Sequence, residues 1–107
     1  AKPWALMTSY NPVNGVLANA NWEAINGVLR GEWGFDGVVM TDWWVLSTLE
    51  EEIHAGVDVK MPEEVNTGYE NPVRPCDPVG LLQSGKLDRG AVLNSVRRIL
   101  QLMNKLD

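Results

Sequence analysis

The sequence is poor in the residues that metal sites and disulfides need. Its 107 residues include one cysteine, Cys76, and one histidine, His54. A single thiol excludes an internal disulfide and a thiolate cluster, and a single imidazole has no second histidine with which to share a metal ion. We therefore expect a loop thiol at Cys76, a packing or helix C-terminal role for His54, and no metal or other cofactor.

Basic residues and long apolar runs are also scarce. Nine Lys and Arg against 14 Asp and Glu give a net charge of −5, which argues against nucleic-acid binding because phosphates need a basic patch. No apolar run approaches about 18 residues, so the sequence predicts no membrane span. The chain begins Ala1-Lys2-Pro3-Trp4, without an initiator methionine or a signal peptide. This start predicts a chain cut from a longer protein and leaves its compartment open.

Short apolar runs alternate with helical patterns along the chain. The runs cover residues 4–10, 37–42 and 57–61, and each is followed by turn residues and apolar residues at helical spacing. Such alternation is typical of right-handed crossovers and a parallel sheet. The sequence therefore predicts an α/β fold of three parallel βα units, and its length allows one compact domain at most.

Caps, glycines and charges delimit the expected helices. The expected limits are Asn19 or Asn21 with Gly31, a Ser47–Glu50 capping box with Gly56, Asp77 before Pro78 with Gly85, and Asp88 for the last helix. The last helix is expected to bury an apolar stripe of Val92, Val96, Ile99, Met103 and Leu106. Charges expected to favour the helix dipoles are Glu51 and Glu52 in the second helix and Arg97, Arg98 and Lys105 in the last.

Chemistry-bearing side chains follow the predicted strands. The carboxyl ends of parallel strands share one face of a sheet, where α/β folds place their sites. This face is expected to carry Tyr10 and Asn11, then Asp42 with Trp43 and Trp44, and then residues 61–64. Carboxylates beside exposed aromatic rings suit sugars, because rings stack on sugar C–H groups and carboxylates accept hydroxyl hydrogen bonds.

Three linked blocks of sequence resemble glycoside hydrolase family 3. They are MTSYNPVNGVLANANWEAINGVLRGEWGFDGVVMTDWW at residues 7–44, AGVDVKMP at 55–62 and GKLDRGAVLNSVRRIL at 85–100. The blocks occur in the family's order and cover most of the chain. The resemblance implies that residues 1–107 are the carboxyl-terminal part of a catalytic (β/α)8 barrel domain. Its partner is then the remainder of the barrel or other copies of the chain.

The resemblance also implies a set of site residues. In the family, the aspartate of a Ser/Thr-Asp-Trp segment attacks the anomeric carbon, and this role falls on Asp42. Tyr10 resembles a tyrosine that lies beside the nucleophile and contacts the sugar, and Met7 and Trp43 resemble positions that line the same subsite. The alternatives are a cap or turn role for Asp42 and plain packing for Met7 and Trp43.

Other residues of these blocks are expected to be structural. They are Trp22 and Trp33 as core or turn packing, Asp58 at the end of its strand opposite the site, and Glu63 and Glu64 as solvated loop residues. Trp44 stands where the family commonly has a small residue, and it is expected to narrow the pocket. The general acid, which the family usually takes from another loop or domain, is not identifiable in the chain.

The implied activity is that of a retaining β-glucosidase. Such an enzyme acts on terminal β-linked sugars through a covalent glycosyl–Asp42 intermediate. Trp43 favours this branch over β-N-acetylhexosaminidases, whose nucleophile is usually followed by another Asp. The competing hypothesis is a truncated fragment or assembly module without turnover, which the missing acid and missing strands favour for the chain alone. Neither the sugar nor the linkage is indicated.

Three parallel strands cannot close a barrel, which needs eight, and they leave two unpaired edges. We therefore expect the isolated chain to self-associate or to be only marginally folded. Light scattering on the purified chain checks this expectation. A monodisperse monomer with a high and cooperative melting transition would contradict it.

Overall fold

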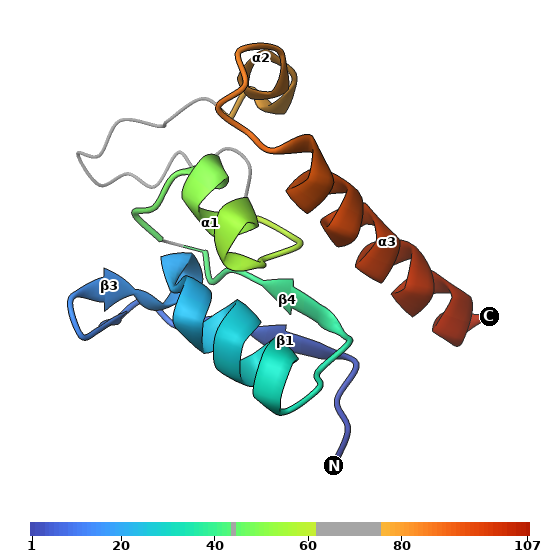
Figure 1. Ribbon diagram of the computed structural model, residues 1–107. Helices are drawn as coiled ribbons and strands as arrows, with labels where there is room; N and C mark the ends of the chain where they lie inside the picture. The colour runs from blue at the N-terminus through green and yellow to red at the C-terminus, as the bar shows by residue number, and fades with distance from the viewer. Residues whose placement is uncertain (44, 62–75) are drawn as a thin grey trace.

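Two short parallel strands form the centre of the molecule. The computed structural model describes residues 1–43, 45–61 and 76–107. Strand β1 (Ala5–Met7) pairs in parallel with β4 (Val38–Met40), so that Ala5 lies opposite Val38 and Met7 opposite Met40 (Figure 1). Beyond β4, residue Val59 makes a single parallel bridge to Met40. The predicted parallel order is present, but the third strand is reduced to this bridge.

The first predicted strand ends early because a hairpin follows it. Strands β2 (Pro12–Val13) and β3 (Val16–Leu17) pair in antiparallel fashion around Asn14 and Gly15. Both turn residues have positive φ, 50° and 80°, which a two-residue hairpin with the twist of the flanking strands requires. The turn was predicted from these residues, whereas the hairpin strands were not.

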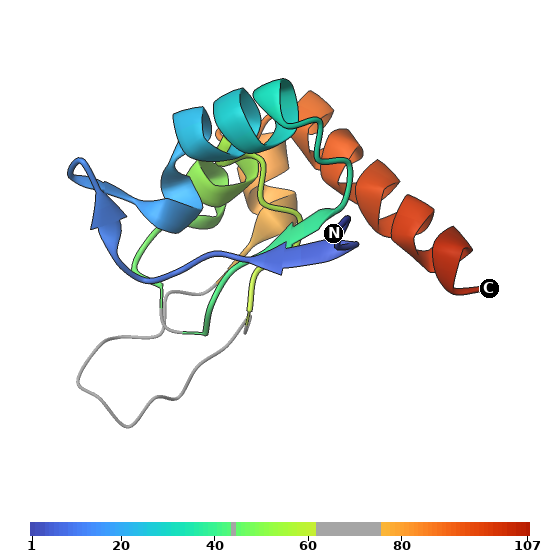
Figure 2. The same ribbon diagram turned by 90° about the horizontal axis from the view of Figure 1, so that it is seen from below.

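The helices lie together on one side of the two strands. After the 3-10 helix η1 (Ala18–Ala20), they are the π-helix η2 (Glu23–Glu32), α1 (Leu49–Ala55), α2 (Pro78–Gln83) and α3 (Arg89–Leu106). Figure 2 shows η2, α1 and α3 above the strands, and no helix of the described residues covers the other face. The buried core between the two layers consists of Ile25, Val39, Ala55 and Val57, with Leu29 and Phe35 packed against it.

Most helix limits agree with those predicted from the sequence. The two that are wrong are the end at Gly31 and the capping box at Ser47–Glu50. The Asp77 and Asp88 side chains cap α2 and α3, and Gly56 ends α1 with a φ of 104°. Asn21, rather than Asn19, accepts a hydrogen bond from the Ala24 N–H. Helix η2 continues past Gly31 to Glu32, and Gly34 takes the positive φ of 67° that follows it. Gly85 has a φ of 77° just beyond α2, as predicted.

The capping box of α1 lies one residue later than predicted. Thr48 has an extended backbone conformation. Its hydroxyl accepts a hydrogen bond from the Glu51 N–H, and its own N–H donates to the Glu51 carboxylate. Ser47 is buried instead and donates to Glu52. Glu52 lies in the first turn of α1, as predicted, but its side chain is turned into the interior, which was not predicted. A local capping rule cannot distinguish adjacent Ser and Thr, because tertiary contacts decide which of them is buried.

The packed side of α3 differs from the predicted apolar stripe. Val92 and Ile99 are half-buried, but Val96, Met103 and Leu106 are exposed, and the buried position is Ser95. Its hydroxyl donates to the Val57 carbonyl. Polar residues occupy this side because they bond to groups of the sheet layer, which an apolar pattern cannot predict. Trp22 and Trp33 are also exposed, at 50% and 74%, so the core interpretation of both is wrong.

A buried carboxylate ties the sheet layer to two helices. The Asp58 side chain is 0% exposed, and its oxygens lie 2.8 Å from Arg30 Nη2 on η2 and 2.7 Å from Arg98 Nε on α3. The Val39 N–H of β4 donates to it at 2.9 Å. Burial lowers the pKa of Arg30, and the charge of Asp58 opposes this shift. The structural interpretation of Asp58 agrees with these contacts. Arg98 binds Asp58 rather than serving the helix dipole.

Asp58→Asn should unfold the chain at lower denaturant concentration. It leaves two half-buried guanidinium groups facing a neutral amide, and breaking one side of a buried charge cluster costs about 3–5 kcal/mol. Urea titration followed by circular dichroism measures the change. The matched control is Asp36→Asn, since Asp36 is 83% exposed and lies 3.9 Å from Lys105, a surface pair worth about 0–1 kcal/mol. Equal losses in both variants would contradict the assignment.

Candidate active site

The carboxyl ends of β1 and β4 bring Tyr10 and Asp42 together. Both strands run in the same direction, so the residues that follow them emerge at the same edge. A hydrogen bond from the Tyr10 hydroxyl to the Asp42 carboxylate raises the pKa of Tyr10, with partial desolvation and the Asp42 charge acting in the same direction. Tyr10 is 51% exposed and Asp42 is half-buried. The pair is therefore formed by the protein and open to a ligand.

The backbone around Asp42 is held on both sides. Before it, the buried Thr41 donates its N–H to the Val59 carbonyl at 2.9 Å, and its hydroxyl accepts from the Met61 N–H at 2.8 Å. After it, the Trp43 N–H donates to Asp42 Oδ1 at 2.7 Å. A carboxylate that ends a bonded strand is more rigid than one at a loop tip, and this rigidity is what a reacting group requires.

Met7 and Trp43 present apolar surface beside this edge. Met7 is 55% exposed and lies opposite Met40 in the β1–β4 register, just before Thr41 and Asp42 in β4's direction. Trp43 is 44% exposed. Exposed thioether and indole groups are costly unless covered, so plain core packing does not describe either residue in this chain. Trp44, Glu63 and Glu64 lie outside the described residues.

A second buried carboxylate was missed from the sequence. Glu52 is 0% exposed and accepts hydrogen bonds from Ser47, Asn19 and Lys60. The only sequence signal is Lys60, eight residues further along, and one such charge pair among many cannot be singled out without the fold. Nothing in the residue pattern of Glu50, Glu51 and Glu52 indicates which of them is interior.

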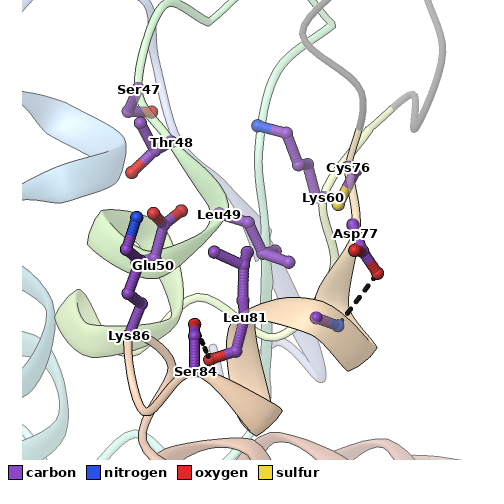
Figure 3. Close-up of a pocket in the computed structure, with 11 residues that line it drawn as sticks. Ser47, Thr48, Leu49, Glu50, Lys60, Cys76, Asp77, Leu81, Ser84 and Lys86 are labelled. Atoms are coloured by element: carbon purple, nitrogen blue, oxygen red, sulfur yellow. Dashed lines mark hydrogen bonds between the residues drawn. The ribbon is translucent and has the colours of Figure 1, made fainter.

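A cavity of about 400 Å³ lies between α1 and α2, away from Asp42. Figure 3 shows that residues 47–50, together with Lys60, Asp77, Leu81 and Lys86, surround it. Neither Asp42 nor Tyr10 lines it. The cavity is therefore not the site of the Tyr10–Asp42 pair, which lies on an open surface of the described residues.

Two kinds of feature are absent from the described part of the chain. No helix there is long and apolar enough to cross a membrane. Nor do three or more His, Cys, Asp or Glu side chains gather there in a group that could hold a metal ion.

Parallel strands with helices on one face and a polar pair at their carboxyl ends define an α/β protein of the class that includes the TIM barrels. Two solved structures of β-glucosidase 3B from Thermotoga neapolitana are similar. The complex with glycerol has a TM-score of 0.86 at 35% identity and the complex with α-D-glucose 0.84 at 36%, each match covering 95% of this chain and 14% of the other.

Curated relatives and a family model agree with the structural match. A β-glucosidase of Rhizobium radiobacter is 39% identical over 102 residues, and probable β-glucosidase J of Aspergillus fumigatus is 37% identical over 105. The matches cover 95% and 96% of this chain but only 12% and 11% of those relatives. The model of the glycosyl hydrolase family 3 N-terminal domain matches residues 1–102. The chain therefore belongs to glycosyl hydrolase family 3.

Asp42→Asn should lower the pKa of Tyr10 toward its ordinary value of 10.0. The carboxylate stabilises the neutral phenol that donates to it and repels the phenolate, so removing its charge favours ionisation. NMR titration of tyrosine labelled with ¹³C at the ζ carbon measures the change. A Tyr69→Phe background leaves Tyr10 as the only tyrosine. Unchanged titration in the Asp42 variant would contradict the pairing.

Proposed function

We propose that this chain carries the nucleophile of a retaining glycoside hydrolase of the β-glucosidase type. The observation that carries the proposal is the Tyr10–Asp42 pair at the carboxyl ends of two parallel strands. Its support comes from membership of family 3 and from similarity to relatives of Aspergillus fumigatus and Rhizobium radiobacter that are named β-glucosidases. In this proposal, residues 1–107 contribute three βα units to a (β/α)8 barrel completed by further strands.

Asp42 acts as the nucleophile. Its ionised carboxylate attacks the anomeric carbon of a terminal β-linked sugar, and the bond from that carbon to the leaving oxygen breaks as the ester forms. A protonated acid about 5–5.5 Å from the nucleophile supplies the leaving group with a proton in retaining enzymes. That acid comes from outside the described residues. Water then attacks the glycosyl ester and releases the free Asp42 carboxylate.

Tyr10 orients the nucleophile and the sugar. Its raised pKa keeps the phenol protonated at neutral pH, so the hydroxyl remains a donor to the carboxylate. One Asp42 oxygen is additionally held by the Trp43 N–H. These two donors restrict the motion of the carboxylate before the substrate binds. Such preorganisation lowers the barrier of the reaction, because less reorganisation is needed when the substrate reacts.

Met7 and Trp43 form the apolar part of the sugar subsite. A pyranose presents C–H faces as well as hydroxyl groups, and an exposed indole stacks on the former. Solved relatives from Thermotoga neapolitana were crystallised with glucose and glycerol, ligands whose hydroxyl and C–H groups suit such a surface. The proposed substrate class is therefore a terminal β-glucoside.

For the 107 residues alone we propose no turnover. The chain spans 14% of the solved relatives' length, and the acid that the reaction needs is not among the residues placed at the site. A chimaera in which residues 1–107 replace the matching segment of β-glucosidase 3B supplies the missing groups. Turnover of an aryl β-glucoside by this chimaera is the expected result, and a folded chimaera without turnover would contradict the proposal.

Asp42→Asn in the chimaera should abolish turnover while sparing the fold, because a neutral amide cannot displace the aglycone. Tyr10→Phe should be milder, since it removes one hydroxyl but leaves the nucleophile in place. A 2-deoxy-2-fluoro glucoside should label the unmutated chimaera on the peptide that contains Asp42, as mass spectrometry can establish. The control is Asp36→Asn, a solvent-exposed carboxylate, which should retain full activity. A label on Glu63 or Glu64 would overturn the assignment.

A further inference from the structure

Glu52 connects several segments around the candidate site, and the proposed reaction does not use its side chain directly. Its side chain is 0% exposed, yet it carries a charge. Three donors converge on Oε1: Ser47 Oγ at 2.6 Å, Lys60 Nζ at 2.7 Å and Asn19 Nδ2 at 3.0 Å. Lys60 also reaches Oε2 at 2.9 Å. A buried carboxylate is costly to desolvate, and this many donors offset that cost while fixing the carboxylate and its partners in one arrangement.

The first partner, Ser47, belongs to the segment that carries Asp42. This segment leaves β4 at Asp42 and reaches α1 at Thr48, so Ser47 is its last residue before the helix cap. Ser47 is 5% exposed and also accepts from the Asn19 amide. Glu52, one turn into α1, therefore holds the far end of the segment whose near end is the proposed nucleophile.

The second partner, Asn19, belongs to the segment that carries Tyr10. The hairpin β2–β3 leaves Tyr10 at Asn11 and returns at Ala18, where the Ala18 N–H donates to the Asn11 carbonyl at 3.2 Å. Asn19 is 0% exposed. Its bonds to Ser47 and Glu52 thus fasten the base of the hairpin, next to Tyr10, to the segment that follows Asp42.

The third partner, Lys60, lies between two residues that hold Thr41. Val59 accepts from the Thr41 N–H, and the Met61 N–H donates to the Thr41 hydroxyl. The Lys60–Glu52 ion pair, with Lys60 21% exposed, therefore anchors the two residues that fix the backbone immediately before Asp42.

We propose that Glu52 is a positioning residue for the Tyr10–Asp42 pair, which its buried carboxylate aligns through Asn19, Ser47 and Lys60. The catalytic meaning of this inference rests on the proposed function, whereas the alignment itself is a property of the chain. The charge is needed because every partner is a donor. A glutamine would present its own N–H groups either to the Lys60 ammonium or to the Asn19 amide.

Three variants test the positioning role in the 107-residue chain with Tyr69→Phe. Glu52→Gln removes the charge and replaces one carboxylate oxygen by an N–H donor. Ser47→Ala removes one tether while leaving the Lys60 ion pair. Ser95→Ala is the matched control, because Ser95 is a serine that is 3% exposed and donates one hydrogen bond, to the Val57 carbonyl, without contacting Glu52 or its partners. Circular dichroism reports the fold of each.

The readout in the chain is the titration of Tyr10 by ¹³C NMR. The pKa of Tyr10 is raised mainly by the hydrogen bond to Asp42, with desolvation and the Asp42 charge acting in the same direction. Misalignment of the two segments should therefore return the Tyr10 pKa toward its ordinary value. We expect this shift in Glu52→Gln and a smaller one in Ser47→Ala, and no shift in Ser95→Ala. A shift of equal size in Ser95→Ala, an unmoved titration in the other two variants, or an ordinary pKa in the unmutated chain overturns the inference.

The readout in the chimaera is the separation of kcat from KM. Small displacements of reacting groups can cost up to roughly 100-fold in rate. We expect Glu52→Gln to lower kcat by about this much with a far smaller change in KM, and Ser95→Ala to leave both unchanged. A loss confined to KM contradicts the positioning role. A chimaera without turnover, together with the expected Tyr10 shifts, overturns the proposed function while the alignment stands.

Discussion

The parallel pairing of β1 with β4 is the constraint on which the candidate site depends. It places the ends of two segments distant in sequence at the same edge, so that Tyr10 can donate to Asp42. The strands are only three residues each, too few for ladder bonds alone to hold the register. The structure supplements them with charged groups from the helix layer and from the segment after α1.

Two buried carboxylates, Asp58 and Glu52, hold the strands in place from different sides. Asp58 bonds to the Val39 N–H and to Arg30 and Arg98, and so joins β4 to η2 and α3. Glu52 bonds to groups near the carboxyl ends, on the side of the Tyr10–Asp42 pair. A small chain buries little apolar surface, and such charged clusters define one arrangement where a small core alone permits several. Their burial makes each sensitive to the loss of a single partner.

The face of the strands that no described helix covers fits the interior of the proposed barrel. The helices cover one side, as the outer helices of a barrel do, and exposed Met7 lies on β1 at the level of Met40. In the proposed barrel this face is turned to the interior and the edge of β1 pairs with a preceding strand. In that proposal, the α/β layering of the chain is that of one sector of the closed barrel.

The sequence by itself determined the alternation of strands and helices, the Asn14-Gly15 turn, the caps at Asp77 and Asp88, and the family to which the blocks around Asp42 point. These depend on local backbone geometry and on linked motifs, which are readable without the fold. Only the tertiary structure decided that Glu52 and Ser95 are buried, that Trp22 and Trp33 are not, and that Arg98 serves Asp58. Burial of a charge depends on partners far along the chain, and the energy of such a pair exists only once folding has brought the partners together and removed water from between them.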